Sequence, residues 1–298
     1  MKVGILGAGR YGKALGGVLR KRGHLCYYFD PFVFPDRNLK DVTDFSDVLI
    51  LATPTGAVRE IISQFPDRAF AKPLIVTTKG MLDKALYDKF RKYEILAGPA
   101  FAEDILAGKR VKLTVAGYGV LSELTVSENL FKSPTFLMDK TEDVFGVMML
   151  GALKNIYAIE SGRRGLNPKS EEFKEYILAV LKEAQKFLIY NGGFLETVRF
   201  SAGVGDFVLT SGSEKSRNYC FGKRLGEFER EFGARRGSRF DVFRPLKDKR
   251  FFQMVSGENQ TIEGISAVRE IEKNGLFVPR ELEILPDIIR RIRYAVKC

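Results

Sequence analysis

The chain is poor in the residues that metal binding and nucleophilic catalysis usually require. It contains one histidine, His24, and three cysteines, Cys26, Cys220 and Cys298. The cysteines are odd in number, lie far apart and form no CxxC pair, so neither a disulfide framework nor a zinc site is indicated. A Ser-His-Asp triad or a histidine-rich metal site is excluded unless His24 itself serves, and its place in a Gly23-His24 turn favours a structural role. We expect no bound metal, and acid–base chemistry must rely on Lys, Asp, Glu or Tyr.

Long apolar runs and targeting signals are also missing. The longest strongly apolar stretches, residues 48–53 and 144–153, fall well short of the roughly 20 residues that a membrane-spanning helix requires. The run from Met1 to Leu6 leads directly into a glycine-rich turn and lacks the apolar core and cleavage site of a secretory signal. We therefore expect a cytoplasmic protein without a membrane span.

Size and charge restrict the class of protein further. With 298 residues, 45% hydrophobic and 29% charged, the sequence is typical of a soluble globular protein of two domains. The net charge is +11, and residues 213–250 alone hold twelve basic and six acidic side chains. This excess favours an anionic partner, such as a phosphorylated small molecule, a nucleic acid or a membrane surface. A solvated basic surface is the alternative.

The first half of the chain alternates apolar β-type runs with helical patterns, whereas the second half is typical of helices only. Apolar runs bounded by Gly, Pro and Asp indicate buried parallel strands, and their alternation with helices indicates βαβ units. We predict an α/β fold, with an N-terminal Rossmann-like doubly wound sheet in residues 1–141 followed by an all-α C-terminal domain in residues 142–298. The predicted strands are 2–6, 25–29, 48–52, 74–77, 94–97 and 111–116, and the predicted helices are 12–22, 55–64, 83–91, 143–161, 170–190 and 262–274.

A G-x-G-x-x-G motif joins the first predicted strand to the first predicted helix. The first glycine allows a tight turn, the second lets the backbone approach a pyrophosphate, and the third lets the helix pack closely on the strand. Asp30 ends the second predicted strand 18 residues after the last glycine, where a carboxylate accepts hydrogen bonds from a ribose. We therefore predict a dinucleotide site rather than a purely structural turn, with candidate residues Gly7, Gly9, Arg10, Tyr11, Gly12 and Asp30.

The residues around Asp30 bear on which dinucleotide binds. A carboxylate at this position would repel the additional phosphate of NADP, and the next residues are Pro31 and Phe32 rather than an arginine. NAD is therefore the favoured cofactor, and NADP remains possible.

Two lysines occupy unusual positions. Lys154 lies in a helical segment that is apolar on nearly every face, which implies burial. Desolvation lowers the pKa of a buried lysine toward the working pH, as a general acid or base requires. The alternative is a lysine that snorkels to the surface. Lys79 follows a predicted strand, at the sheet edge where ligands of open α/β folds bind. The alternative interpretation of Lys79 is a solvated lysine in a loop.

The segment from residue 201 to residue 218 holds further candidates. Asp206 is isolated among apolar residues, where it could orient a lysine. Ser216, Arg217 and Asn218 offer a hydroxyl, a planar bidentate donor and an amide, a combination suited to a phosphate group. The alternative is a helix cap followed by a surface arginine.

Seven segments carry a family pattern, in order and over almost the whole chain: GAGRYGKALG, TTKGM, GPAFAEDILAGK, DVFGVMMLGALKNIYAI, AGVGDFVLT, SRNYCFGKRLGE and TIEGISAVREI. Together they make the chain resemble the NAD(P)-dependent glycerol-3-phosphate dehydrogenases. The pattern departs from the family in having Pro31 where an arginine is often found, and residues 163–181 and 233–253 are poorly matched.

This resemblance implies reduction of dihydroxyacetone phosphate to sn-glycerol 3-phosphate, the backbone precursor of phospholipids, by a homodimer. Lys154 matches the family's proton donor and acceptor, and Asp206 and Lys79 match its charged partners at the reacting centre. The other residues that match substrate contacts are Gly98, Ala100, Asn155, Thr210, Ser216, Arg217 and Asn218, and those that match cofactor contacts are Tyr11, Lys79, Ala102, Arg217, Thr261 and Glu263.

Two other classes of protein share part of this pattern. A ketopantoate reductase or a β-hydroxyacid dehydrogenase would use the same glycine loop and lysine, but would not explain Ser216-Arg217-Asn218. A dinucleotide-sensing protein that binds nucleic acid would explain the charge of +11, but has no need of a lysine in an apolar helix. We expect a small phosphorylated substrate and no nucleic acid.

Overall fold

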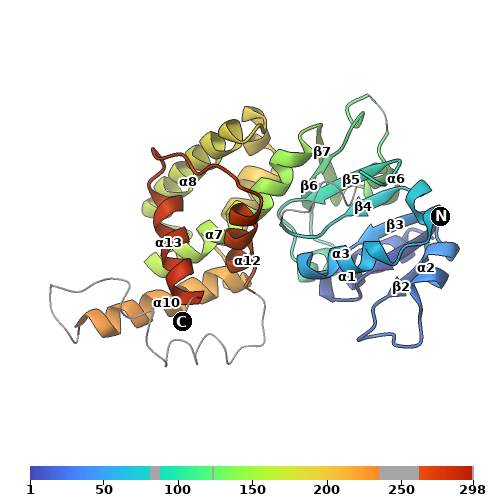
Figure 1. Cartoon of the computed structure of the whole chain (residues 1–298), viewed down its shortest axis with the longest axis horizontal. Coiled ribbons are helices and arrows are strands. Elements are labelled where there is room, and N and C mark those ends of the chain that lie inside the picture. The colour runs from blue at the N-terminus through green and yellow to red at the C-terminus, as the bar shows by residue number, and fades with distance from the viewer. Residues whose placement is uncertain (81–87, 123, 235–261, 297–298) are drawn as a thin grey trace. The chain divides into compact units, whose positions relative to one another are not determined.

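The computed structural model describes residues 1–80, 88–122, 124–234 and 262–296, which form two compact units (Figure 1). The first unit comprises Met1–Met148 and Arg199–Ala202, and the second comprises Met149–Val198 and Gly203–Cys298. Among the described residues, none of the helices combines the length and the apolar character needed to span a bilayer.

The first unit is built on a seven-stranded sheet in the order β2-β1-β3-β4-β5-β6-β7. The first five strands pair in parallel, as their continuous apolar sequences predicted. β6 runs antiparallel to β5 and parallel to β7, so the prediction of parallel strands throughout is wrong at this one junction, because an apolar run indicates burial but not strand direction. The strands are β1 (Lys2–Leu6), β2 (Leu25–Phe29), β3 (Val48–Leu51), β4 (Leu74–Val76), β5 (Tyr93–Ala97), β6 (Val111–Ala116) and β7 (Phe136–Thr141).

The sequence did not predict β7. This strand pairs only with β6 and forms one edge of the sheet, and four of its six side chains are only partly buried. An edge strand that is half solvated keeps polar residues such as Asp139 and Lys140, so its apolar signal is weak.

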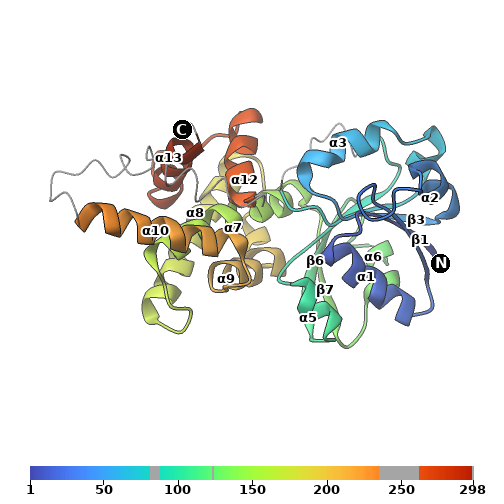
Figure 2. The same ribbon diagram turned by 90° about the horizontal axis from the view of Figure 1, so that it is seen from below.

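Helices cover both faces of the sheet, which makes it doubly wound as predicted (Figure 2). One face packs side chains such as Ile5 and Ile50 against α1 (Arg10–Lys21), α5 (Ala102–Leu106) and α6 (Val126–Phe131). The other face packs Leu49 and Leu51 against α2 (Leu39–Phe45) and α3 (Thr55–Ser63). Successive residues of β3 thus enter opposite cores, because side chains alternate along a strand.

The helix predicted at residues 83–91 is wrong where it can be compared with the structure. Residues 81–87 lie outside the described residues, and residues 88–91 form a turn. The backbone N–H of Arg91 donates to the carbonyl of Phe70 (3.1 Å), and the ring centroids of Phe70 and Phe90 lie 5.0 Å apart. Contacts with a distant segment therefore override the local helical pattern.

The second unit contains helices and no strand among its described residues. Its central element is α7, whose residues from Met149 to Ile159 are nearly all buried. The helices are α7 (Val144–Arg164), which begins in the first unit, α8 (Glu171–Tyr190), α9 (Asp206–Ser211), α10 (Arg217–Ala234), α12 (Glu263–Lys273) and α13 (Ile284–Val296). A 3-10 turn at Leu195–Arg199 and a π-helical turn at Ser201–Gly205 precede α9.

Helix α10 packs closely against α7. A Cβ atom at Gly222 would collide with the carbonyl oxygen of Ile159, and one at Gly226 would collide with that of Arg163. The two glycines let the helix backbones approach each other as a larger residue could not. The positions of the facing residues on the two helices are therefore set by backbone contact.

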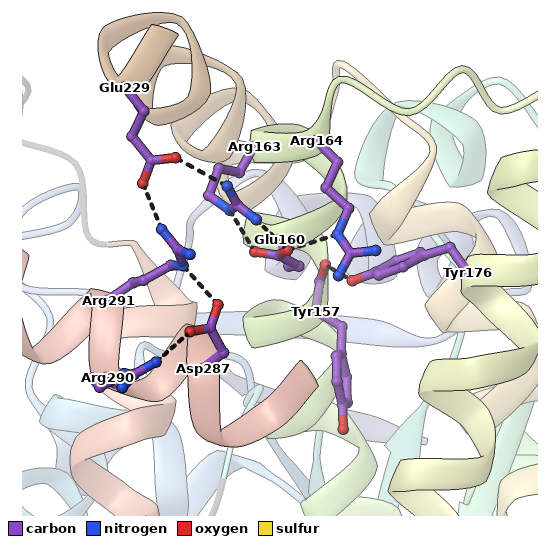
Figure 3. A network of polar contacts seen from close by, with 9 residues as sticks. All are labelled: Tyr157, Glu160, Arg163, Arg164, Tyr176, Glu229, Asp287, Arg290 and Arg291. Carbon is purple, nitrogen blue, oxygen red and sulfur yellow. Dashed lines mark hydrogen bonds and ion pairs between the residues drawn. The ribbon is translucent and has the colours of Figure 1, made fainter. Parts of the chain in front are cut away.

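A chain of alternating charges connects α7, α10 and α13 (Figure 3). Arg163 binds both carboxylate oxygens of the buried Glu160 (2.6 and 2.7 Å) and also binds Glu229 of α10 (2.9 Å). Glu229 also accepts from Arg291 of α13 (3.0 Å), which binds Asp287 (2.7 Å). Desolvation offsets much of the attraction between charges that are partly buried in this way. The ion pairs connect specific residues of the three helices to one another.

Candidate active site

The glycine loop leaves open space at the start of α1. Gly7 has a φ of +109°, and its N–H donates to the carbonyl of Phe29 (2.8 Å). A Cβ at Gly7 would lie 2.6 Å from the carbonyl oxygen of Ala52, and one at Gly12 would collide with the Gly7 carbonyl oxygen. A Cβ at Gly9 would meet no atom within 4 Å, so packing within the protein does not require this glycine. Space beside an uncapped helix N-terminus suits a phosphate group.

Asp30 connects the glycine loop to the turn after β2. Its Oδ2 atom accepts a hydrogen bond from the backbone N–H of Ala8 (2.7 Å). Its Oδ1 atom accepts from the backbone N–H groups of Phe32 (3.0 Å) and Val33 (3.2 Å). A carboxylate offers about four acceptor positions, so Oδ2 can still accept from a ribose hydroxyl. Asp30 therefore holds the loop and can bind a ligand as well.

The other predicted residues of the glycine loop have different surroundings. Arg10 forms an exposed ion pair with Glu103 of α5 (3.3 Å). Tyr11 is partly buried and packs against the core under the loop.

The carboxyl ends of β4 and β5 hold the remaining candidates of the first unit. Lys79 is exposed, and its carbonyl accepts a hydrogen bond from the hydroxyl of Thr55 (2.5 Å). Gly98 has a φ of +145°. Its carbonyl accepts a hydrogen bond from the N–H of Ala100 (2.9 Å), and this hydrogen bond closes a turn before α5. Ala102 is the first residue of α5 and is buried. Parallel strands place these loops at the same sheet edge as the glycine loop.

Lys154 and Asp206 form a buried ion pair in the second unit. The Lys154 ammonium contacts Oδ2 of Asp206, and the two residues are 2% and 3% exposed, which rules out a snorkelling lysine. Oδ1 of Asp206 accepts a hydrogen bond from the hydroxyl of Thr210 (3.2 Å), one turn later on α9. The three predicted residues thus form one cluster of an ammonium, a carboxylate and a hydroxyl.

A second cluster surrounds Asn155, the next residue on α7. The side-chain amide of Asn218 donates to Oδ1 of Asn155 (3.0 Å) and to Oε2 of Glu263 (3.4 Å). The backbone N–H of Gly264 donates to Oδ1 of Asn218 (2.9 Å). Arg217 forms an ion pair with Glu263, and its side chain is 43% exposed. The residues predicted from the family pattern therefore meet here from α7, α10 and α12.

One predicted residue of the second unit, Ser216, has a contact of a different kind. Ser216 is buried, and its hydroxyl oxygen accepts from the backbone N–H of Tyr219 (3.3 Å), as in a helix cap at the start of α10. This contact fits the structural alternative for Ser216. Thr261 lies outside the described residues, as do residues 235–250 of the basic segment.

A group of buried residues that contact α7 one turn after Lys154 was not predicted from the sequence. The hydroxyl of Tyr157 donates to Oε2 of Glu183 (3.0 Å), and the carbonyl of Tyr157 accepts from the hydroxyl of Tyr176 (2.6 Å). Burial, with Glu183 nearby, raises the pKa of Tyr157 well above its ordinary value. Tyr157 remains a neutral donor, and the only signal for it was a tyrosine one turn after Lys154 in an apolar helix.

Comparison with known proteins connects these clusters to one family. Residues 143–290, which include both clusters, match the family model described as the C-terminus of NAD-dependent glycerol-3-phosphate dehydrogenase. The chain is 28% identical over 266 residues to the glycerol-3-phosphate dehydrogenase [NAD(P)+] of Fusobacterium nucleatum, with 76% of this chain and 79% of the relative covered. It is 27% identical over 311 residues to the enzyme of the same name from Acinetobacter baylyi, with 93% and 81% covered.

Solved structures show the same fold. The glycerol-3-phosphate dehydrogenase of Coxiella burnetii superposes with a TM-score of 0.71 at 23% identity, and 98% of each chain is covered. The yeast glycerol-3-phosphate dehydrogenase superposes with a TM-score of 0.68 at 18% identity, with 97% of this chain and 99% of the yeast chain covered. The chain belongs to the NAD(P)-dependent glycerol-3-phosphate dehydrogenase family, which is a family of oxidoreductases.

Proposed function

We propose that this protein reduces dihydroxyacetone phosphate to sn-glycerol 3-phosphate with NAD(P)H, and that Lys154 is the proton donor. The buried ion pair of Lys154 with Asp206 carries the proposal. A lysine at 2% exposure is costly to bury, and structural packing alone does not require its charge. Relatives that bear the name of this activity support it.

The first unit would bind the cofactor. The open space at Gly9 and the N-terminus of α1 suit the pyrophosphate, and Asp30 suits the adenosine ribose. When bound, the reduced cofactor supplies the hydride. We expect NADH to be preferred, because the carboxylate of Asp30 would repel a 2′-phosphate.

Lys154 would supply the proton. As the carbonyl oxygen gains negative charge, the ammonium stabilises it and transfers a proton from Nζ. Asp206 holds that ammonium in place, and Thr210 orients the carboxylate through Oδ1. Lys79 would add a second positive charge at the reacting centre.

The second cluster would bind the substrate phosphate. Arg217 is accessible enough to bind an anion, and its planar guanidinium suits two phosphate oxygens. Asn218 donates a hydrogen bond to Asn155 and accepts one from the backbone of Gly264, so its amide is positioned in advance. The net charge of +11 also favours an anionic substrate.

We expect the product to supply phospholipid synthesis and the enzyme to act in the cytoplasm as a homodimer.

Oxidation of NADH and, separately, of NADPH by the purified protein tests this function. Dihydroxyacetone phosphate is the substrate, and ketopantoate and hydroxypyruvate are the controls. Rapid turnover with dihydroxyacetone phosphate and NADH supports the substrate and the role of Asp30. Preference for NADPH would support the same reaction but contradict the role of Asp30 in favouring NADH. Turnover of ketopantoate or hydroxypyruvate alone would replace this function by another reductase activity.

A further inference from the structure

Phe32 exposes its aromatic ring almost completely to solvent. It is 96% exposed, more than any other large apolar side chain among the described residues. Single apolar side chains at a surface are common and need no explanation by themselves. The position of this ring and the hydrogen-bonded turn that carries it are the features that call for an explanation.

The turn that carries Phe32 is held by hydrogen bonds and ring contacts. The N–H groups of Phe32 and Val33 donate to Oδ1 of Asp30, and those of Val33 and Phe34 donate to the Asp30 carbonyl (3.2 and 2.8 Å). The guanidinium of Arg37 lies over the ring of Phe34, 4.3 Å from its centroid. The backbone of the turn is therefore fixed while the Phe32 ring faces outward.

This turn lies beside the proposed cofactor site. β1 and β2 are parallel and end together, with Leu6 opposite Phe29, so the glycine loop and the Phe32 turn leave the sheet at one edge. The carboxylate of Asp30 joins them, because Oδ2 binds the N–H of Ala8 and Oδ1 binds that of Phe32. With a pyrophosphate at Gly9 and a ribose at Asp30, the base attached to that ribose would lie next to Phe32.

We propose that Phe32 is the adenine platform of the dinucleotide site, with its ring stacked on one face of the purine. The inference rests on the proposed function and adds to it a binding residue that the family pattern did not include. Stacking of a base on an aromatic side chain contributes enough to change the dissociation constant about tenfold. A phenyl ring carries no charge for a 2′-phosphate, so this contact strengthens binding of NAD and NADP equally.

A tryptophan reporter tests the contact directly. The chain contains no tryptophan, so Phe32→Trp introduces a single indole whose fluorescence reports on that position alone. We expect NAD⁺ and 5′-AMP to quench it, and nicotinamide mononucleotide, which has no adenine, to leave it unchanged. Tyr118→Trp is the matched control. Tyr118 is 69% exposed and follows β6, which runs antiparallel to β5, so it lies at the opposite sheet edge and its reporter should respond to none of the three.

Calorimetry separates this inference from the proposed function. Phe32→Ala should raise the dissociation constant for NAD⁺ and for 5′-AMP about tenfold and leave that for nicotinamide mononucleotide unchanged. One outcome is that the wild-type protein binds NAD⁺ while the fluorescence of Phe32→Trp does not change with NAD⁺ or 5′-AMP and Phe32→Ala binds both as tightly as the wild type does. That result would overturn the adenine platform and leave the proposed function standing. If the wild-type protein binds no dinucleotide, both are overturned.

Discussion

Lys154 of α7 and Asp206 of α9 are 52 positions apart in the chain and form an ion pair that is almost wholly buried. Burial removes most of the hydration of both charges, and the attraction between the two side chains offsets part of that loss. Asn155, the next residue after Lys154 on α7, accepts a hydrogen bond from Asn218, one of the proposed phosphate-binding residues on α10.

Replacement of Lys154 should remove catalysis and spare cofactor binding. We expect Lys154→Met to lower kcat by about a thousandfold, the order of magnitude of general acid catalysis by a positioned side chain. The dissociation constant for NADH should change little, because the glycine loop belongs to the first unit. Stopped-flow kinetics and calorimetry measure the two effects. Lys174→Met, at an exposed site on α8, is the control, and substantial residual activity in Lys154→Met would remove Lys154 from the mechanism.

Replacement of Arg217 should affect the phosphorylated substrate in particular. Arg217→Ala should raise the apparent KM for dihydroxyacetone phosphate by about tenfold or more, because a charge-assisted hydrogen bond contributes roughly 1.5–3 kcal/mol. With dihydroxyacetone, which has no phosphate, the variant and the wild type should have similar kcat/KM. Unchanged kinetics with both substrates would make Arg217 a surface residue beside a helix cap.

Asp30 should influence the choice between NADH and NADPH. Asp30→Asn keeps a side-chain oxygen that can accept from Ala8 and removes the charge that would repel a 2′-phosphate. We expect the ratio of kcat/KM for NADH to that for NADPH to fall by about tenfold, the effect of roughly 1.4 kcal/mol. Steady-state kinetics with both cofactors measure it. An unchanged ratio would restrict Asp30 to holding the loop.

Glu183 should contribute to stability through the start of α13. Its carboxylate accepts from the N–H groups of Glu283, Ile284 and Leu285 (2.6, 2.7 and 3.0 Å) and from the hydroxyl of Tyr157. Glu183→Ala leaves these buried and partly buried donors without an acceptor, and we expect the free energy of unfolding to fall by about 3 kcal/mol. Urea denaturation measures this change. Glu172→Ala, at an exposed site on the same helix, should change it by less than about 0.5 kcal/mol.

Glu128 should make the first unit more sensitive to acid. Burial tends to raise the pKa of Glu128, but hydrogen bonds from the Thr125 backbone and from Lys132 and Lys140 outweigh it and lower the pKa below its ordinary value of 4.5. A lowered folded-state pKa contributes stability above the unfolded-state value, and that stability is lost as the pH falls through the folded-state value.

The Glu128→Gln variant tests this contribution. The free energy of unfolding of the wild type should fall more steeply below pH 4.5 than that of the variant, and the two curves should run parallel near pH 7. Denaturation curves measured across this range give both slopes. Equal slopes in acid would show that Glu128 has no such role.

Local features of the sequence determined much of the fold. The apolar runs at 2–6, 25–29 and 111–116 became β1, β2 and β6 with the predicted bounds, and the glycine motif lies between β1 and α1 as expected. The apolar helix around Lys154 predicted burial, and the structure confirms it. These features concern burial and backbone geometry within one segment, which side-chain periodicity and glycine spacing record directly.

Relationships between distant segments were decided only by the tertiary structure. The antiparallel direction of β6, the edge strand β7 and the turn at residues 88–91 all depend on which segment packs alongside. The same holds for the cap formed by Ser216 and for the hydrogen bond between Asn155 and Asn218, which are 63 positions apart. Periodicity shows that a face is buried but not which element buries it, because the partner is selected by the packing of the whole chain.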